Sequence, residues 1–349
     1  MKLLVDMNFV MFRSMHTSTS MTMDVSWAPR PVSTGSAKLA FSTILRVFNR
    51  LKKANPTMKM SDIVVCDDWG RSFRKDLFPG YKKKRSEKKR TPEEENAFTD
   101  MFVMKNLVLY VLDCLDCHTY AKKRYEADDT IGFLTRIFSR GKVNSCILSS
   151  DSDLSQLINP YTSMIRPEGK DLMHYTLSNM AYMVRFNNKN KDYWGCETPY
   201  DILLFKALVG DSTDEYPGVP GFGEAKWLKI KEHMKMNDIT SANVLADPDT
   251  FFSEYGWTGK AAKKVDEIFI KHKESYLLCK KLAKIQRNGK PVRKKVFYRP
   301  SQSEGSMDPI NAVYSPGKFD FESAMKALSS YEMRETIETL RDMRVMGIL

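Results

Sequence analysis

The sequence lacks any apolar run long enough to cross a bilayer, which takes about 20 consecutive apolar residues. No signal-peptide pattern precedes the first apolar segment, because Met1 and Lys2 lead directly into Leu3-Leu4-Val5-Asp6, a pattern typical of a strand. Internal repeats, heptad arrays and low-complexity tracts are also missing. These absences argue against membrane, secreted, solenoid and coiled-coil proteins, and they predict a cytoplasmic protein without a membrane partner.

Cysteine and histidine are scarce, with 6 and 5 residues in a chain of 349. Cys114 and Cys117 form a lone C-x-x-C, and no second pair or histidine pair at zinc spacing accompanies it. The motif lies in an apolar helical stretch, which favours buried thiols over zinc or redox chemistry. The histidines are scattered and fit no motif, so none is predicted to be catalytic.

The chain does have five short acidic clusters, most of them directly after an apolar run or at the start of a helix. Carboxylates brought together repel one another, and a shared divalent cation with oxygen ligands removes that repulsion. Any one cluster is explained equally well by helix capping. All five at matching positions favour metal binding by nine carboxylates: Asp6; Asp67; Glu126, Asp128 and Asp129; Asp151 and Asp153; Asp211 and Asp214.

Positive charge dominates the rest of the chain, which has a net charge of +12. Residues 71–90 carry ten Lys/Arg against two acidic residues, and residues 259–300 carry fourteen against three. A solvated basic face would explain either run alone. Two dense runs beside metal-binding clusters favour a phosphodiester backbone as the partner.

Strand and helix patterns alternate up to about residue 177, which predicts a mostly parallel α/β sheet. The predicted strands cover residues 2–6, 63–66, 118–121 and 145–149, and a hairpin follows near 165–175. Helices are predicted over 37–54, 92–115, 128–139 and from the end of the strand 145–149 through Leu157, whereas 16–34 and 68–92 are predicted to be loops. Ligands of such sheets bind at the carboxyl ends of strands, where Asp6, Asp67 and Asp151 fall.

The later part of the chain reads as helical up to about residue 300, then as a Ser/Pro/Gly-rich linker over 301–318. Apolar residues at helical spacing predict a final helix or helix pair, which we expect to dock on the protein's own core in preference to a partner. Directly after Asp214, the closely spaced Gly218, Gly221 and Gly223 precede a helix. Such glycines let backbone N–H groups approach a phosphate, although an ordinary helix connection is the alternative.

In this order and spacing the motifs resemble the 5′ nuclease family of flap endonucleases and 5′→3′ exonucleases, in its bacterial and phage branch, over about residues 1–230. The family's first Asp with an Arg seven residues later resembles Asp6 and Arg13, and its E-A-D-D and D-x-D motifs resemble residues 126–129 and 151–153. Its glycine motif resembles residues 210–223, with Glu215 in place of Asn. Its D…FR…YK..R motif resembles Asp67, Phe73, Arg74, Tyr81, Lys82 and Arg85. A chain that ends at 349 without a polymerase domain is similar to stand-alone enzymes of the phage ribonuclease H type, which act in the host cytoplasm.

The resemblance implies a PIN-like catalytic domain over residues 1–177, with a helical arch at about 70–110. It implies an all-α subdomain over 178–300 with a helix–two-turn–helix element that grips duplex DNA, and a linker and C-terminal helix over 301–349. It also implies two Mg²⁺ ions, for which Mn²⁺ can substitute, and leaves K⁺ open as a further ion at the glycine motif. One ion would be held by Asp67, Glu126, Asp128 and Asp151, with Asp6 and Asp129 through water, and the other by Asp153, Asp211 and Asp214.

The implied reaction is two-metal hydrolysis at 5′ flaps, nicks and ends of DNA, and of RNA primers in RNA·DNA hybrids, by a monomer. Lys82 and Arg85 would stabilise charge on the scissile phosphate, and Asp67 and Asp151 would act through the first ion. A replication clamp or a single-strand binding protein is a candidate partner. Ten residues are expected to contact DNA: Arg13, Arg74, Tyr81, Lys82, Lys83, Arg85, Gly218, Gly221, Gly223 and Lys226.

The aromatic residues near the basic run have two interpretations. Tyr81, Phe73 and Trp69 are of a type that stacks on bases. For Phe73 and Trp69 the sequence favours packing in the core.

Two alternative functions remain at this point. A PIN-like endoribonuclease for single-stranded RNA needs neither the glycine motif nor the basic domain downstream. A structure-specific DNA-binding protein without catalysis does not need the complete carboxylate set. The sequence leaves open which of flap cleavage, exonucleolytic degradation and primer removal dominates.

Overall fold

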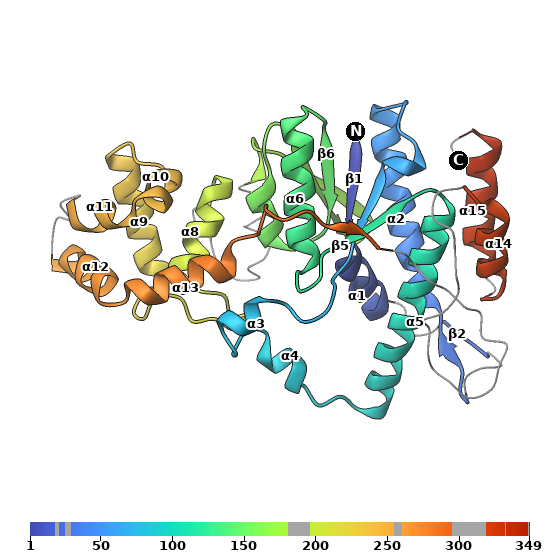
Figure 1. Cartoon of the computed structure of the whole chain (residues 1–349), viewed down its shortest axis with the longest axis horizontal. Helices are drawn as coiled ribbons and strands as arrows, with labels where there is room; N and C mark the ends of the chain where they lie inside the picture. Colours follow the sequence, from blue (N-terminus) through green and yellow to red (C-terminus); the bar gives the residue numbers. More distant parts are fainter. Residues whose placement is uncertain are drawn as a thin grey trace.

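A seven-stranded sheet forms the centre of the molecule in the order β8-β7-β6-β1-β4-β5-β9 (Figure 1). The computed structural model describes residues 1–17, 21–24, 29–180, 196–254, 260–294, 319–331, 333–347 and 349. Five strands run parallel: β1 (Lys2–Asp6), β4 (Ile63–Cys66), β5 (His118–Ala121), β6 (Ser145–Leu148) and β7 (Thr162–Glu168). The edge strands β8 (Asp171–Tyr175) and β9 (Val292–Arg293) are antiparallel to their neighbours. The mostly parallel α/β sheet predicted from the sequence is therefore confirmed.

The central strand β1 separates two hydrophobic cores, because its successive side chains point to opposite faces. Leu3 and Val5 pack with α1 (Met7–Thr17), α2 (Gly35–Ala54) and α5 (Pro92–Cys114). Leu4 packs on the other face with α6 (Ala127–Arg140) and with the helical region that follows. Because both faces of β1 are covered, its residues Leu3, Leu4 and Val5 are all apolar and do not alternate with polar ones.

Four stretches differ from their expected local structure. Helix α1 follows β1 without a break and begins where the Asp6 carboxylate accepts the N–H of Phe9 at 3.1 Å, a contact that the apolar pattern alone does not reveal. The expected loop 16–34 contains a small hairpin of β2 (Thr22–Met23) and β3 (Val32–Ser33). The stretch 68–92 contains the short helices α3 (Arg74–Leu77) and α4 (Lys83–Glu87), and the segment η2 (Ser152–Leu157) is a 3₁₀-helix.

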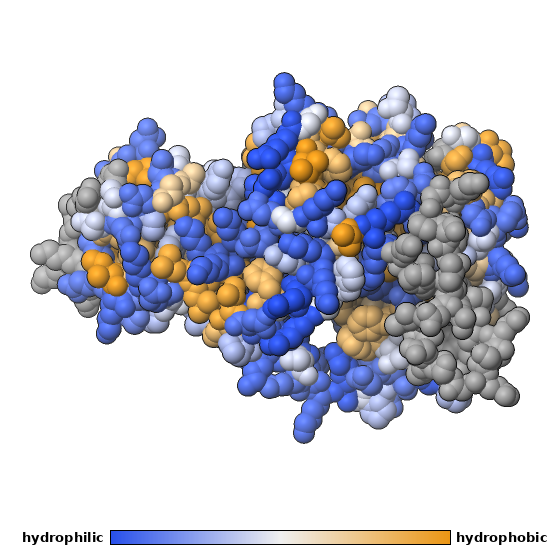
Figure 2. Space-filling view, viewed as in Figure 1, coloured by the Kyte–Doolittle hydropathy of each residue, from blue (hydrophilic) through white to orange (hydrophobic). Residues whose placement is uncertain are grey.

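The predicted arch region curves away from the sheet through α3, α4 and the start of α5 (Figure 1). Helix α5 begins at Pro92, as predicted, and the structure gives the reason: Thr91 and Glu94 form a reciprocal capping box and three glutamates fill the first turn. The space-filling view shows an opening inside this curve and a surface that is hydrophilic over most of the arch (Figure 2).

The helical region lies beyond α6, on the side of the sheet that Leu4 faces (Figure 1). It consists of α8 (Pro199–Val209), α9 (Glu224–Met236), α10 (Ser241–Ala246), α11 (Pro248–Glu254), α12 (Lys260–Lys271) and α13 (Lys273–Ala283). One feature corrects the expectation of an all-α segment up to residue 300. Strand β9 returns to the sheet and pairs with β5 through Tyr120 and Ala121.

The C-terminal helices α14 (Phe321–Ser329) and α15 (Arg334–Val345) form a pair at the opposite end of the molecule (Figure 1). Helix α14 packs on α5 and α15 on α2, and their apolar residues join the core that includes Leu3 and Val5. The expected docking on the protein's own core is confirmed. The predicted linker 301–318 lies outside the described residues. No helix in the described part of the chain is long and apolar enough to cross a membrane.

Leu340→Ala should measure how much this docking contributes. The side chain is 0% exposed, and replacing a buried leucine by alanine typically lowers the free energy of unfolding by about 2–5 kcal/mol. Val345→Ala on the same helix is the matched control, because Val345 is 88% exposed and should change stability by less than about 0.5 kcal/mol. Urea unfolding of both variants compares them, and equal losses would contradict the docked arrangement.

Candidate metal centre and nucleic-acid interface

The carboxyl ends of three neighbouring strands bring the first acidic residues to one edge of the sheet. Strand β1 lies between β4 and β6, and Asp6 is paired in register with Cys66 while Val5 is paired with Leu148. Asp67 follows β4 directly, and Asp151 follows the end of β6. Helix α6 starts at the same edge with Glu126 as its N-cap and Asp128 in its first turn. The predicted position at the strand ends is confirmed for Asp6, Asp67 and Asp151.

Four of the clustered carboxylates have no ion-pair partner among the described side chains. Among the described residues, no lysine or arginine forms an ion pair with Asp6, Asp68, Asp128 or Asp151, which we call the uncompensated group. Asp6 accepts hydrogen bonds from the Phe9 N–H at 3.1 Å and the Ser149 hydroxyl at 2.8 Å. Asp68 accepts the N–H of Ala127 at 2.7 Å.

Electrostatics within the uncompensated group favour a bound cation. Burial raises the pKa of Asp6 to about 7, with a further contribution from the charge of Asp151. Burial, followed by the charges of Asp151 and Asp6, raises the pKa of Asp128 well above its usual range. The pKa of Asp68 is also raised by burial. Closely spaced oxygen donors of this kind fit Mg²⁺ or another hard divalent ion.

Asp67 differs from the uncompensated group because two lysines neutralise it. Lys105 of α5 forms an ion pair with one oxygen, and the Lys294 ammonium lies 2.6 Å from the other. Burial alone would raise the pKa of Asp67, but the two ammonium groups lower it below its usual value. Asp67 is therefore held ionised by the protein itself.

Side chains of the arch contact both carboxylate oxygens of Glu126. The Lys82 ammonium is 2.7 Å from one of its oxygens, and the other accepts from Arg74 at 3.1 Å and from the Tyr81 hydroxyl at 3.0 Å. Although burial opposes it, Lys82 and Arg74 lower the pKa of Glu126.

Asp129 is engaged by protein groups on both oxygens. Arg74 binds it with two hydrogen bonds of 2.7 and 2.8 Å, and the N–H of Gln286 donates to it at 2.8 Å. Arg74 also donates to the backbone carbonyls of Leu282 and Lys284, so it ties α3 to the end of α13. The predicted water-mediated metal contact of Asp129 and the predicted DNA contact of Arg74 stay predictions. The geometry favours positioning roles for both, because both side chains are buried.

The second acidic group contains Asp153, Asp211 and Asp214, with one oxygen of each within 4.8 Å of the others. The three residues predicted to share the second ion are thus close enough to do so. Lys206 forms ion pairs with Asp153 and, at 2.5 Å, with Asp211. Burial raises the pKa of Asp153 to about 7. Burial also acts to raise the pKa of Asp211, but Lys206 lowers it.

Lys82 and Arg85 reach the acidic groups from the arch. Besides Glu126, the Lys82 ammonium faces Asp214 at 3.6 Å, and Arg85 lies 3.4 Å from the same carboxylate. The Arg85 side chain is 56% exposed, whereas that of Lys82 is 19% exposed. Both basic groups therefore border the metal centre from the side on which the arch lies.

Two of the three aromatic residues near the basic run, Tyr81 and Trp69, lie in environments opposite to the expected ones. Tyr81 is buried, and its hydroxyl lies 2.8 Å from Asp214 as well as near Glu126, so its ring is not available for base stacking in this conformation. Trp69 is 39% exposed, so the core packing that the sequence favoured for it is wrong. Phe73 is half-buried against Tyr125, with ring centroids 5.0 Å apart.

The glycines of the motif differ in whether a side chain would fit at their position. A side chain at Gly218 would place its Cβ 2.4 Å from the Val209 carbonyl carbon, so this glycine is required for packing. Gly223, the N-cap of α9, has extended backbone and open space around it. Gly221 is exposed, and its carbonyl accepts from the half-buried Lys226.

The remaining predicted DNA contacts lie on α1 and α4. Arg13 is half-buried on α1, where burial, followed by the positive charges of Arg46 and Arg166, lowers its pKa. Lys83 on α4 is exposed and pairs with Glu87 at 3.5 Å.

Four residues of the site were missed by sequence reasoning. Asp68 was overlooked beside Asp67. Lys105 and Lys206 each interrupt an apolar helical run, and a lysine in such a run is a usable signal for a buried ion pair. Lys294 had no local signal, because it belongs to a dense basic run whose members look alike.

Comparisons with known proteins agree with this geometry. Residues 1–185 match the family model described as 5′-3′ exonuclease, N-terminal resolvase-like domain. A 5′-3′ exonuclease of Mycoplasma genitalium is 31% identical over 192 residues, which are 55% of this chain and 59% of that protein. DNA polymerase I of Bacillus caldotenax is 31% identical over 228 residues, which are 65% of this chain and 22% of that protein. The chain thus spans less than two thirds of the length of these relatives.

Two solved structures share the fold over nearly their whole length. The bacteriophage T5 5′-exonuclease with bound zinc has a TM-score of 0.59 at 18% identity and covers 98% of both chains. A complex of a bacteriophage T5 flap endonuclease with DNA and metal ions has a TM-score of 0.58 at 16% identity and covers 97% of both chains. At these identities the likeness shows the fold alone.

Proposed function

Since the chain belongs to the 5′-3′ exonuclease family, we propose that it hydrolyses phosphodiester bonds at the 5′ ends and flaps of DNA in a reaction that depends on divalent metal ions. The observation that carries the proposal is the pair of acidic groups bordered by Lys82 and Arg85, one at the strand ends and one formed by Asp153 of η2 with Asp211 and Asp214 after α8. We extend the proposal to RNA primers in RNA·DNA hybrids.

The donor set fits two divalent ions. The uncompensated group, with Asp67 and Glu126, would hold one, and Asp153, Asp211 and Asp214 would hold the other. Bound ions of this kind supply a water of lowered pKa and stabilise the charge of an in-line displacement.

The side chains of the arch would position the phosphate. Lys82 lies 2.7 Å from Glu126; burial acts to lower its pKa, but Glu126 and Asp214 raise it, so it stays positively charged. When a substrate phosphate enters, Lys82 and Arg85 can exchange part of their carboxylate contacts for phosphate oxygens. Arg74 and Asp129 fix α3 against α13, and thereby hold the arch over the site.

The helical region is proposed to bind the duplex arm of the substrate. We keep the domain limits 1–177, 178–300 and 301–349 as a hypothesis. Gly221 and Gly223 would let the backbone approach phosphates at the start of α9, where the helix dipole favours an anion, with Lys226 beside them and K⁺ as a further candidate ion. Both the exposed Lys83 and the half-buried Arg13 remain proposed contacts.

Gly223→Val tests this contact. Since the space around Gly223 is open and its backbone is extended, valine should fold there, yet it would obstruct the approach of a phosphate backbone. We expect affinity to fall about tenfold for substrates with a duplex arm and to stay unchanged for short single strands. Binding is measured by fluorescence polarisation, with circular dichroism to check folding. Equal loss on both substrates would contradict the proposed contact.

The function itself is tested by cleavage with and without Mg²⁺ on a 5′-flap duplex, a nicked duplex, an RNA·DNA hybrid and single-stranded RNA. Cleavage of flap and nicked DNA that stops on chelation is the expected result, with the hybrid cut as well. Cleavage of single-stranded RNA alone would favour the endoribonuclease alternative. Binding of the flap without cleavage in any metal would favour a non-catalytic DNA-binding protein.

The setting of this activity is also a hypothesis. We propose a monomeric, phage-type enzyme that acts in the cytoplasm during replication or repair, with a clamp or a single-strand binding protein as partner. The similarity to the T5 folds is compatible with it.

A further inference from the structure

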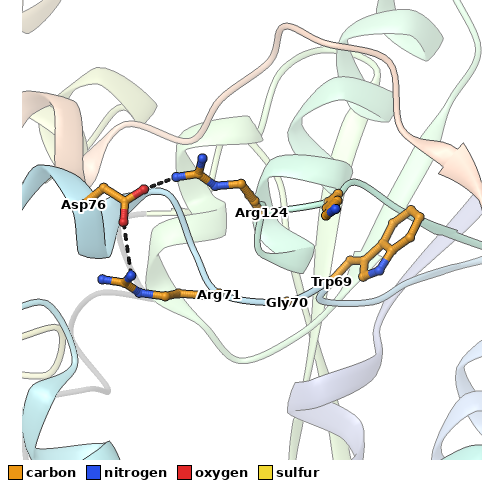
Figure 3. Close-up of a pocket in the computed structure, with 6 residues that line it drawn as sticks. Trp69, Gly70, Arg71, Asp76 and Arg124 are labelled. Atoms are coloured by element: carbon orange, nitrogen blue, oxygen red, sulfur yellow. Dashed lines mark hydrogen bonds and ion pairs between the residues drawn. The ribbon is translucent and has the colours of Figure 1, made fainter.

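A cavity of about 380 Å³ lies beside the metal centre and takes no part in the proposed mechanism. Its size is that of a small-ligand site, since such pockets usually measure about 300–1,000 Å³. It is lined by Trp69, Gly70, Arg71, Asp76, Lys123 and Arg124 (Figure 3).

The lining combines an aromatic face with excess positive charge. Trp69 is 39% exposed and stands apart from the charged cluster (Figure 3). Arg71 and Arg124 both point to Asp76, which is the single carboxylate among three basic side chains. The side chains of Arg71 and Arg124 are 67% and 56% exposed, and ion pairs this open to water contribute little. A phosphate can therefore replace Asp76 as their partner at small cost.

The backbone joins the cavity directly to the metal ligands. The N–H of Arg124 donates to the Trp69 carbonyl at 2.7 Å, and the N–H of Trp69 donates to the Tyr125 carbonyl at 3.3 Å. Trp69 follows Asp67 by two residues, a chain distance of at most roughly 7 Å.

Backbone conformation supports a functional role for the same segments. Arg124 has φ 70°, in the left-handed region that residues other than glycine seldom occupy. Strain of this kind persists where the surroundings enforce it, and it concentrates at binding and active sites. Arg124 lines the cavity and lies two residues before Glu126, the N-cap of α6.

We propose that this cavity binds one unpaired nucleotide of the substrate strand, with its base stacked on Trp69 and its phosphate held by Arg71 and Arg124. The proposal rests on the nucleic-acid substrate of the proposed function. Stacking does not depend on the identity of the base, because every base has a π-face, so the site tolerates any sequence.

The stacking contact is tested by measuring the affinity of the full chain for three substrates. A chelator is present throughout, so that no cleavage occurs. One duplex has an unpaired 5′ arm, the second has no arm, and the third has abasic sugars in the first arm positions. Trp69→Ala should weaken binding of the duplex with an unpaired arm about tenfold, which is the loss expected for one base stack. Its affinity for the duplex without an arm and for the duplex with abasic sugars should stay unchanged. Trp69→Phe should restore most of the affinity. Leu77→Ala is the matched control, because Leu77 is 42% exposed on the neighbouring α3 and does not line the cavity.

The phosphate contact has its own measurement. Arg71→Gln should reduce the slope of log affinity against log salt by about one for the substrate with an arm. An unchanged slope would overturn this contact. Unchanged affinity of Trp69→Ala for the arm substrate, or an equal loss on all three substrates, would overturn the stacking site.

Cleavage by the wild-type protein separates this proposal from the proposed function. If flap DNA is cut in Mg²⁺ but Trp69→Ala binds the arm normally, the nucleotide site fails and the nuclease function stands. If nothing is cut in any metal while binding depends on Trp69 and on the arm base, the nuclease function fails and the nucleotide site is supported.

Discussion

Asp151→Asn and Asp153→Asn should each reduce the rate of cleavage by on the order of 10³-fold or more. Stabilisation of transition-state charge by a metal ion contributes several kcal/mol, and about 1.4 kcal/mol corresponds to a tenfold change in rate. The two residues lie in different acidic groups: Asp151 belongs to the uncompensated group, and Asp153 belongs to the group with Asp211 and Asp214. If both ions are needed, neither group can replace the other.

Affinity for DNA should change little in either variant, because the basic residues of the arch and the helical region remain. Single-turnover cleavage and polarisation on a flap substrate separate the two effects, and calorimetry counts the bound Mn²⁺ ions. Each variant should lose one of the two ions. Asp249→Asn is the control, since this carboxylate is 58% exposed on α11 and pairs only with Lys273 among the described residues. Near-wild-type turnover in both variants would refute the two-metal assignment.

Lys82→Ala should slow the chemical step by on the order of 10²–10³-fold, the usual effect of removing one donor to developing charge. The ammonium group is largely buried between Glu126 and Asp214, so water does not easily replace it. Its removal also leaves Glu126 with only Arg74 and Tyr81 as partners among the described side chains. We expect the affinity for DNA to fall less than threefold.

The matched control for Lys82 is its neighbour. Lys83→Ala removes the same charge from an exposed side chain on α4, and it should alter binding slightly and chemistry not at all. Single-turnover rates at saturating enzyme, repeated over a range of Mg²⁺ concentrations, distinguish a phosphate contact from a weakened metal site. If excess Mg²⁺ restores the rate of Lys82→Ala, the lysine acts through Glu126. If only affinity falls, the proposed catalytic role is wrong.

The sequence predicted the sheet well because both of its faces are covered. Strands β4 and β5 were located to the residue: β4 is a short apolar run that ends before Asp67, and β5 ends where the basic residues Lys122 and Lys123 begin. Helix α1 was missed, as its start depends on the Asp6 carboxylate and not on an apolar period. Strand β9 was also missed, because two residues next to a basic run carry too little signal to indicate a pairing with β5.

The carboxylates of the site could be predicted from the sequence, whereas the lysines that pair with them could not. Carboxylates at strand ends converge because the topology brings strand ends together, so position along the chain is enough to locate them. The lysines that balance them come from α5, from α8 and from the residue after β9, and their partners depend on how distant elements pack. Exposure of Trp69 and burial of Tyr81 depend on how the arch folds back over α6, which local patterns do not encode.

The return of β9 to the sheet also affects how the protein is made. Lys294 meets Asp67 across 227 residues of sequence, and Arg74 meets the Leu282 carbonyl across 208. During translation the five parallel strands, the last of which ends at Glu168, emerge well before β9. The edge strand and the second ammonium group on Asp67 arrive only with the end of the helical region. The nascent chain therefore carries all nine carboxylates on the ribosome long before residue 294 completes the balance of charge around them.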